Sequence, residues 1–297
     1  MPNRLLLVDA YSQIYRAFFA IRSLTGPNGE PVNALYGFTK MLRKMLADYR
    51  PSHCAVVFDL GAPRERLSIL PSYKEQRPPT PPELDAQLPA IRDVIAAMRL
   101  PIMEFDGEEA DDLIATVAVR AAQAAWDVLI ASNDKDFAQI VGPHLRLVRP
   151  DGNEVAVWEA AEVEARYGVK PEQMVDFLSL TGDSVDNIRG VIGVGEKTAA
   201  DLLRRYGSVD KLLSSLDEIP KPKLREAVRA AADQLRTNQR LIALRTNLRV
   251  DVLLENLILQ RPDYARLMEI CRRFGFKSLL AEWEKESQRP ADLFASL

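Results

Sequence analysis

At 297 residues the chain is long enough to bury a sizeable core, and its length favours one large domain with a smaller one. Apolar residues make up 47% and charged residues 27%, which is ordinary for a globular protein, and the absence of a long apolar run excludes a membrane-spanning segment. The net charge of −3 does not exclude a nucleic-acid binder, because acids clustered at one site would leave basic residues in surplus elsewhere.

The scarcity of histidine and cysteine restricts the chemistry of any metal site. With only two of each, a zinc site built on imidazole or thiolate is not expected, so oxygen ligands and hard cations such as Mg²⁺ or Mn²⁺ remain. The N-terminus lacks the basic region, long apolar core and cleavage site of a signal peptide. We therefore expect a cytoplasmic protein in which Cys54 and Cys271 are reduced and buried.

Three short apolar runs, at residues 5–8, 55–58 and 128–131, have the character of buried parallel strands. Between them, apolar residues recur at helical spacing over residues 35–46, 88–95 and 113–121. This alternation predicts an α/β fold with a mostly parallel central sheet flanked by helices.

Each apolar run is followed by aspartate, and ligands bind beyond the carboxyl ends of strands in such sheets. The acids concerned are Asp9, Asp59, Asp134 and Asp136. One such aspartate is commonplace as a helix N-cap, but three strand ends favour convergence on a metal.

Residues 107–112 place four carboxylates at the start of the third helical pattern. Acids in a first helical turn complement the helix dipole, which explains one or two of them. Glu109 and Asp112 share a helix face and repel each other unless a cation lies between them, while Asp111 lies to one side. On this stretch alone, helix capping and metal binding remain equally open.

From residue 63 to residue 82, basic residues and Tyr73 alternate with prolines that forbid a regular helix at the end of the segment. The basic residues are Arg64, Arg66, Lys74 and Arg77. Two interpretations remain open. The segment is either an exposed, solvated loop or a basic arm that grips a polyanion, with Tyr73 free to stack on a base.

After residue 150 the sequence becomes mostly helical, and we expect a catalytic α/β domain over 1–170, a helical domain over 171–260 and a helical return with a tail over 261–297. A helix ends with Asp183 and Asp186, and residues 190–198 form a helix–hairpin–helix motif. Its glycines let a phosphate approach the backbone, which gives binding without sequence readout. The residues predicted to contact DNA there are Gly190, Gly193, Gly195, Lys197, Thr198 and Arg204.

Two competing interpretations of these motifs fail. A nucleotide-binding P-loop needs a four-residue loop before its Gly-Lys pair and a preceding apolar strand, and Gly195-Glu196-Lys197 has neither. A phosphatase with Asp9 as nucleophile would carry a second aspartate two residues later, where Tyr11 stands.

Together these motifs resemble the 5′-nuclease family, which comprises the nuclease domain of bacterial polymerase I enzymes, phage 5′-exonucleases and flap endonucleases. The resemblance covers residues 4–285. In chain order it rests on Asp9 with Tyr15-Arg16-Ala17-Phe18, Phe58-Asp59 with Arg66, Tyr73-Lys74 with Arg77, Glu109-Ala110-Asp111-Asp112, Asp134-Lys135-Asp136, Asp183 with Asp186, and residues 190–198. Two departures, Ala10 in place of glycine and Arg189 in place of proline, remove no predicted metal ligand.

The resemblance implies Mg²⁺-dependent hydrolysis of DNA phosphodiester bonds from a free 5′ end, flap or nick, with 5′-phosphate products and Mn²⁺ as a substitute. We assign Asp9, Asp59, Glu109 and Asp111 chiefly to one metal ion, and Asp134, Asp136 and Asp183 to a second. Asp112 and Asp186 are ligands directly or through water. Lys74 and Arg77 would donate to the scissile phosphate, while Arg16 and Arg66 would contact phosphate or support the ligands.

The family also implies K⁺ at the hairpin, a monomer, and a role at the bacterial nucleoid in primer or flap removal and repair. Two alternatives are kept: a PIN-like ribonuclease, and a structure-specific DNA binder without catalysis. Residues 290–294 resemble a sliding-clamp motif, although we favour a terminus without such a partner. The preference between exonuclease and flap endonuclease, and between a free-standing protein and an excised domain, stays open.

Overall fold

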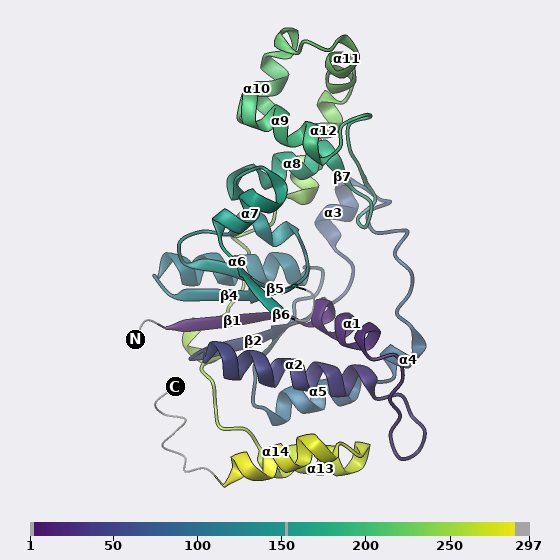
Figure 1. Ribbon diagram of the computed structural model, residues 1–297, viewed down its shortest axis with the longest axis vertical. Coiled ribbons are helices and arrows are strands. Elements are labelled where there is room, and N and C mark those ends of the chain that lie inside the picture. Colours follow the sequence, from purple (N-terminus) through teal and green to yellow (C-terminus); the bar gives the residue numbers. More distant parts are fainter. Residues whose placement is uncertain (1–2, 152–153, 289–297) are drawn as a thin grey trace.

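The computed structural model describes residues 3–151 and 154–288 (Figure 1). Its centre is one six-stranded sheet. In spatial order the strands are β3 (Ile102–Met103), β2 (His53–Val57), β1 (Arg4–Asp9), β4 (Asp127–Ala131), β5 (Leu145–Asp151) and β6 (Glu154–Trp158). Neighbouring strands are parallel except for β6, which is antiparallel to β5. The predicted α/β class is confirmed, and the three apolar runs are the adjacent strands β2, β1 and β4.

Helices cover both faces of the sheet, which explains the apolar runs in its central strands β2, β1 and β4. On one face lie α1 (Ala10–Ala20), α2 (Asn33–Tyr49), α5 (Leu88–Ala97), α13 (Tyr264–Phe274) and α14 (Lys277–Ser287). On the other lies α6 (Ala110–Gln123). Alternate residues of β1 divide between the two cores, with Leu6 and Val8 on one side and Leu5 and Leu7 on the other.

A group of helices extends from the α6 side of the sheet (Figure 1). The elements are η1 (Asp136–Ile140), α7 (Ala160–Tyr167), η2 (Pro171–Gln173), α8 (Met174–Thr181), β7 (Gly182–Asp183), β8 (Ile188–Arg189), α9 (Glu196–Tyr206), α10 (Val209–Ser214), η3 (Leu216–Glu218), α11 (Pro222–Ala230) and α12 (Ala232–Ile242). Phe177 of α8 and Leu203 of α9 belong to the same buried cluster as Ile114 of α6. The helical part therefore shares its core with the sheet.

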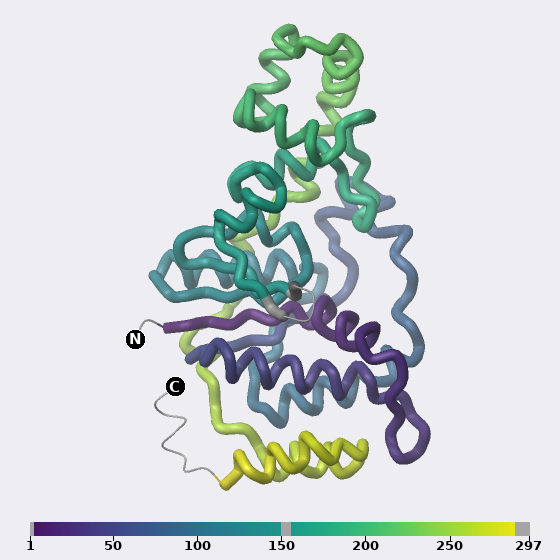
Figure 2. The backbone as a smooth tube through the Cα atoms, in the orientation of Figure 1, coloured from purple at the N-terminus to yellow at the C-terminus, as the bar shows by residue number. Residues whose placement is uncertain are grey.

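After α12 the chain runs back along the sheet to its opposite side, as Figure 2 shows. On the way η4 (Leu254–Leu257) reaches β2, and the Leu259 N–H donates to the Ser52 carbonyl over 3.0 Å. Helices α13 and α14 follow. The predicted clamp motif at residues 290–294 lies outside the described residues. In the part of the chain that the structure describes, no helix has the length and apolar character to cross a bilayer.

The proline-rich segment leaves the sheet as α3 (Arg64–Ile69), turns over residues 71–76 and continues without helix to α4 (Pro82–Asp85). Residues 77–81, which include Pro78, Pro79 and Pro81, are not helical, as predicted, and a helix begins only at Pro82. The Lys74 N–H donates to the Asp186 carbonyl over 3.2 Å. This contact holds the segment, which we call the basic arm (residues 63–82), against the loop between β7 and β8.

Candidate metal centre and its surroundings

The carboxyl ends of β1, β2 and β4 bring acids to one edge of the sheet. Asp9 ends β1 and caps α1: one oxygen accepts from the Ser12 N–H at 3.1 Å and the other from the Ser132 hydroxyl at 2.6 Å. Burial raises the pKa of Asp9 to about 7 against these two hydrogen bonds, and the charges of Asp59 and Asp134 add to the rise. Among the described residues no lysine or arginine forms an ion pair with Asp9, so its charge is compensated only by these two hydrogen bonds.

The start of α6 adds the next carboxylates to this edge. Asp59 accepts from the Ala110 N–H over 2.8 Å, which joins the end of β2 to the first turn of the helix. Burial raises the pKa of Asp111 well above its ordinary value, and the charges of Asp134, Asp9 and Asp59 push it in the same direction. Asp9, Asp59, Asp111 and Asp134 therefore lie close enough for their charges to repel, and a bound cation would relieve that repulsion.

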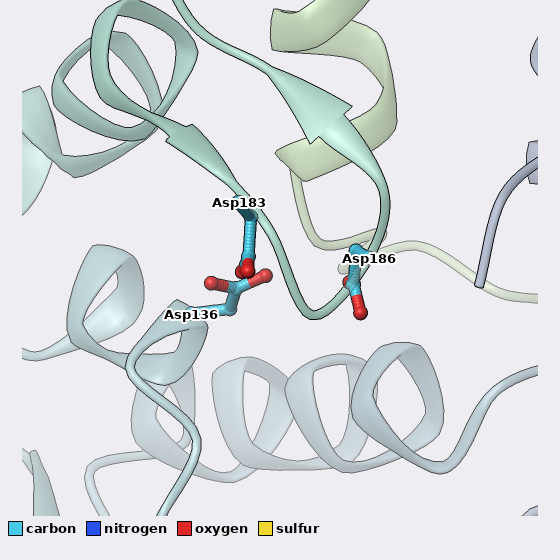
Figure 3. Close-up of side chains that lie close together, drawn as sticks. All are labelled: Asp136, Asp183 and Asp186. Carbon is cyan, nitrogen blue, oxygen red and sulfur yellow. The ribbon is translucent and has the colours of Figure 1, made fainter. Parts of the chain in front are cut away.

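A second group of acids lies beside the first. Asp136, Asp183 and Asp186 offer oxygens that all lie within 4.8 Å of one another. Figure 3 shows the Asp136 and Asp183 carboxylates facing each other, with Asp186 on the loop that follows. One buried oxygen of Asp136, Oδ1, has no hydrogen-bond partner. Burial and the charges of Asp134, Asp186 and Asp183 raise its pKa well above the ordinary value.

Asp134 connects the two groups, since its charge raises the pKa of Asp9 and Asp111 on one side and of Asp136 on the other. All donors are carboxylate oxygens, which suits hard divalent cations. The unpartnered buried oxygen of Asp136 and the carboxylates of raised pKa fit such an ion. Without a bound cation, each of these groups costs the folded protein free energy.

Asp112 is engaged differently from its neighbour Asp111. It is fully buried, and its oxygens accept from Arg66 at 2.5 and 3.0 Å and from the Arg245 N–H at 2.9 Å. Burial favours the neutral acid, but Arg66 and Arg245 outweigh it and lower the pKa of Asp112. Asp112 is predicted to be a metal ligand directly or through water; in the structure both of its oxygens accept from guanidinium and backbone donors.

Glu109 shares this ion-pair network. Arg66 Nη1 lies 2.5 Å from Glu109 Oε2, and Lys74 Nζ pairs with the other oxygen. Arg66 is only 6% exposed and also donates to the Leu241 carbonyl over 2.8 Å. Of its two predicted roles, contact with phosphate is incompatible with this burial, whereas support of a candidate ligand matches the geometry.

The basic arm reaches the second group of acids. Arg77 donates to one oxygen of Asp186 at 2.6 Å, and the Tyr73 hydroxyl donates to the other at 3.0 Å. Tyr73 is 5% exposed, so the prediction that it is free to stack on a base is wrong: the apolar ring is buried and only its hydroxyl contacts the site. Burial opposes the charge of Lys74, but Asp111, Glu109 and Asp186 together raise its pKa.

The glycines of the predicted DNA-binding hairpin have two different roles. A Cβ at Gly190 would lie 2.3 Å from the Thr181 backbone, so this glycine lets β7 and β8 approach each other. That local packing explains Gly190 without DNA. At Gly193, which has a φ of +79°, and at Gly195, a Cβ would meet nothing within 4 Å, so the backbone there faces open space.

The remaining predicted DNA contacts lie around the start of α9. Gly195 precedes the helix with no side-chain cap, and Lys197 is exposed in its first turn. Thr198 is half-buried in the same turn, while Arg204 is exposed in the last turn of the helix and pairs with Asp201 at 2.8 Å. Arg16 lies on α1, where it contacts the Met41 sulfur over 3.6 Å.

The sequence of this chain matches the descriptions of a known protein family along most of its length. Residues 4–168 match the family described as the N-terminal resolvase-like domain of 5′-3′ exonucleases, and residues 169–265 match their C-terminal SAM fold. The chain belongs to the 5′-3′ exonuclease family. It is therefore a member of a family of hydrolytic nucleases whose metal-binding character agrees with the acids described above.

The relatives of this chain are of two lengths. It is 38% identical to a 5′-3′ exonuclease of Aquifex aeolicus, over 95% of each chain. It is 39% identical to DNA polymerase I of Bacillus caldotenax over 97% of this chain, but spans only 33% of that relative. Among solved structures, bacteriophage T5 flap endonuclease in a complex with DNA and metal ions shares the fold, with a TM-score of 0.67, 20% identity and coverage of 97% and 100% of the two chains.

Two residues at the candidate metal centre were not singled out from the sequence. Lys135 Nζ lies 2.9 Å from Asp183, and its position between Asp134 and Asp136 was the available signal. Arg245 pairs with Asp112 and also with Glu65 and Glu108. No local pattern marks Arg245, since only the return of the chain after α12 brings it to the start of α6.

Proposed function

We propose that this chain hydrolyses phosphodiester bonds in DNA that carries a free 5′ end, as a 5′→3′ exonuclease and a 5′-flap endonuclease, and leaves 5′-phosphate products. The observation that carries the proposal is the pair of adjoining acid groups at one sheet edge, bordered by the basic arm. Hydrolysis of a phosphodiester bond needs positive charge next to the phosphate. The two acid groups would supply it by binding divalent cations. The names of the polymerase I and flap endonuclease relatives support the same substrate.

We further propose Mg²⁺ as the native cofactor, with Mn²⁺ able to replace it. Asp9, Asp59, Asp111 and Asp134 would hold one ion, and Asp136, Asp183 and Asp186 a second, with Glu109 available to the first. Bound divalent ions would activate water and neutralise the charge that develops on the phosphate. The raised pKa values of Asp9, Asp111 and Asp136 support this division, because each of these acids lacks a protein cation strong enough to compensate it.

The protein's own cations would position the substrate. Lys74 and Arg77 lie on the basic arm and reach Glu109 and Asp186, at the border of each acid group. From there they would donate to the scissile phosphate, since fixed charge placed where negative charge develops lowers the barrier. Arg66 would keep Glu109 oriented and Arg16 would contact phosphate farther along the strand.

The helical part would hold the duplex. We propose that the open backbone at Gly193 and Gly195, with Lys197, Thr198 and Arg204, binds phosphate groups, and that a K⁺ ion occupies the hairpin. The division into residues 1–170, 171–260 and 261–297 remains our proposed domain organisation. We propose a monomer that acts on bacterial DNA in the cytoplasm during flap removal and repair. For residues 290–294 we favour a terminus without a partner, and contact with a sliding clamp is the alternative.

One assay separates this function from the alternatives. The protein is incubated with 5′-flap DNA, matched RNA and blunt duplex, each in Mg²⁺ and in EDTA. We expect cleavage of the flap DNA in Mg²⁺ only, with 5′-phosphate products. Cleavage of RNA but not DNA would indicate a PIN-like ribonuclease. DNA binding without cleavage in any metal would indicate a structure-specific binding protein.

A further inference from the structure

A polar pocket of about 440 Å³ lies beside the second acid group. Its volume is in the range of pockets that hold small ligands, roughly 300–1,000 Å³. Three parts of the chain form its walls: Gln76 from the basic arm, Lys135 with Asp183 from the acid group, and Arg189 with Gly190 from the strand that leads into the hairpin. The pocket therefore occupies the space between the candidate metal centre and the hairpin.

The charges in this pocket are suited to an anion. Lys135 lies 2.9 Å from Asp183 and neutralises it, so Asp183 does not make the pocket negative. Arg189 is exposed, and among the described residues its guanidinium forms no ion pair. The backbone of Arg189 is nevertheless fixed, because its carbonyl accepts from Gln234 at 2.6 Å and from Asn238 at 2.8 Å. A guanidinium without an ion-pair partner, carried by a fixed strand, is available to donate to a phosphate.

The pocket also lies on the path that the proposed substrate would take. A strand cleaved at the acid groups and held by its backbone at Gly193 and Gly195 has to cross the region between them. Each nucleotide on that path carries one negative charge, which costs free energy beside carboxylates unless a cation faces it. Arg189 provides this cation at the wall where the pocket meets the hairpin.

We propose that this pocket binds one phosphodiester group of the DNA strand between the scissile bond and the hairpin, with Arg189 as the main donor and Lys135 shared between the phosphate and Asp183. The inference rests on the proposed nuclease function and extends it. Arg189 is assigned as a substrate-positioning residue that sets the register of the strand on the metal centre.

The first test measures the salt dependence of DNA binding. Fluorescence anisotropy gives the affinity of the full chain for a 5′-flap DNA in EDTA, at several salt concentrations, for the wild type, Arg189→Ala and Arg189→Lys. Each neutralised phosphate contributes about 0.7–0.9 to the slope of log K against log salt. We expect Arg189→Ala to bind several-fold more weakly, with the slope reduced by about one contact, while Arg189→Lys keeps most of the slope.

The second test locates the phosphate. Single phosphates next to the cleavage position are replaced in turn by neutral methylphosphonate. In the wild type one replacement should weaken binding, and in Arg189→Ala the same replacement should have little further effect, which a double-mutant cycle reports as coupling. Lys285→Ala on α14, at the opposite end of the molecule, is the control and should show the wild-type slope and the wild-type response to methylphosphonate.

Two results would overturn the proposal: a salt slope unchanged in Arg189→Ala, or additive effects of this variant and every methylphosphonate position. Cleavage of the flap DNA by the wild type in Mg²⁺ is measured beside them. If the wild type cleaves while Arg189 shows no coupling, only the pocket assignment fails. If the wild type does not cleave, the proposed function fails.

Discussion

Asp111 and Asp112 are neighbours in sequence, but their carboxylates have opposite electrostatic surroundings. Asp112 faces Arg66 and Arg245, and its pKa is lowered even though burial alone would raise it. Asp111 is buried as well, yet it faces Asp134, Asp9 and Asp59, and its pKa is raised. Two consecutive residues in the first turn of α6 thus differ: protein cations compensate Asp112 but not Asp111.

This difference distinguishes structural acids from acids held for a ligand. A buried carboxylate with guanidinium partners joins parts of the chain, here the basic arm, α6 and the return segment after α12. A buried carboxylate among like charges costs stability in the absence of a cation. Asp9, Asp111, Asp134 and Asp136 pair with no guanidinium among the described residues and belong to the acids that we assign to metal. Asp112, which Arg66 and Arg245 hold, supports these acids instead.

The largest expected effect is on catalysis, from loss of the uncompensated Asp111. Asp111→Ala should lower kcat on 5′-flap DNA by about 10³-fold or more, or ~4 kcal/mol of activation free energy, because a metal ligand is lost. Anisotropy in EDTA should show nearly unchanged DNA binding, since the hairpin is untouched. Near-normal turnover of Asp111→Ala would remove this residue from the metal centre.

The next largest effect is expected from Lys74, which pairs with Glu109 and lies close to Asp111. Lys74→Met should lower kcat by about 10²–10³-fold, as expected when one donor to a developing charge is removed. Lys44→Met, whose lysine pairs with Asp48 on α2, is the control and should leave kcat unchanged. A loss confined to KM in Lys74→Met would assign the lysine to substrate binding instead of to the transition state.

For the compensated Asp112 the expected effect is on stability. Asp112→Asn leaves Arg66 buried without its main partner, and breaking a buried ion pair costs about 3–5 kcal/mol of unfolding free energy. Urea denaturation of the metal-free protein measures this loss. Asp111→Asn serves as the matched variant, and it should stabilise the metal-free protein because it removes a repelled charge. Equal destabilisation by both substitutions would abolish the distinction between Asp111 and Asp112.

A smaller effect follows from the titration of Asp9. Its pKa in the folded chain, about 7, is above the unfolded value, so without metal the unfolding free energy falls as the pH rises towards 7. Bound metal displaces this proton, and a metal at 100 times its Kd adds about 2.7 kcal/mol. The rise in Tm on addition of Mg²⁺ should therefore be larger at pH 8 than at pH 6. Identical shifts at both pH values would contradict the role of Asp9.

The sequence was sufficient to predict the sheet and the convergence of the acids. Three apolar runs that end in aspartate indicate parallel strands, and parallel strands place Asp9, Asp59 and Asp134 at one edge whatever the details of the loops. It was not sufficient to predict how each acid is compensated. Arg245 stands 133 positions after Asp112, and the inward turn of Tyr73 depends on packing between the basic arm and the loop after β7.

The central claim is that metal is bound at Asp111, which lies among other carboxylates, and not at Asp112, which Arg66 and Arg245 compensate. Titration of Mn²⁺ into wild type, Asp111→Asn and Asp112→Asn by calorimetry, with folding checked by circular dichroism, tests it most directly. We expect Asp111→Asn to lose at least one binding event or at least tenfold in affinity, and Asp112→Asn to keep the wild-type isotherm. A folded Asp112→Asn that loses metal as Asp111→Asn does, or an Asp111→Asn that binds as wild type, would contradict the account.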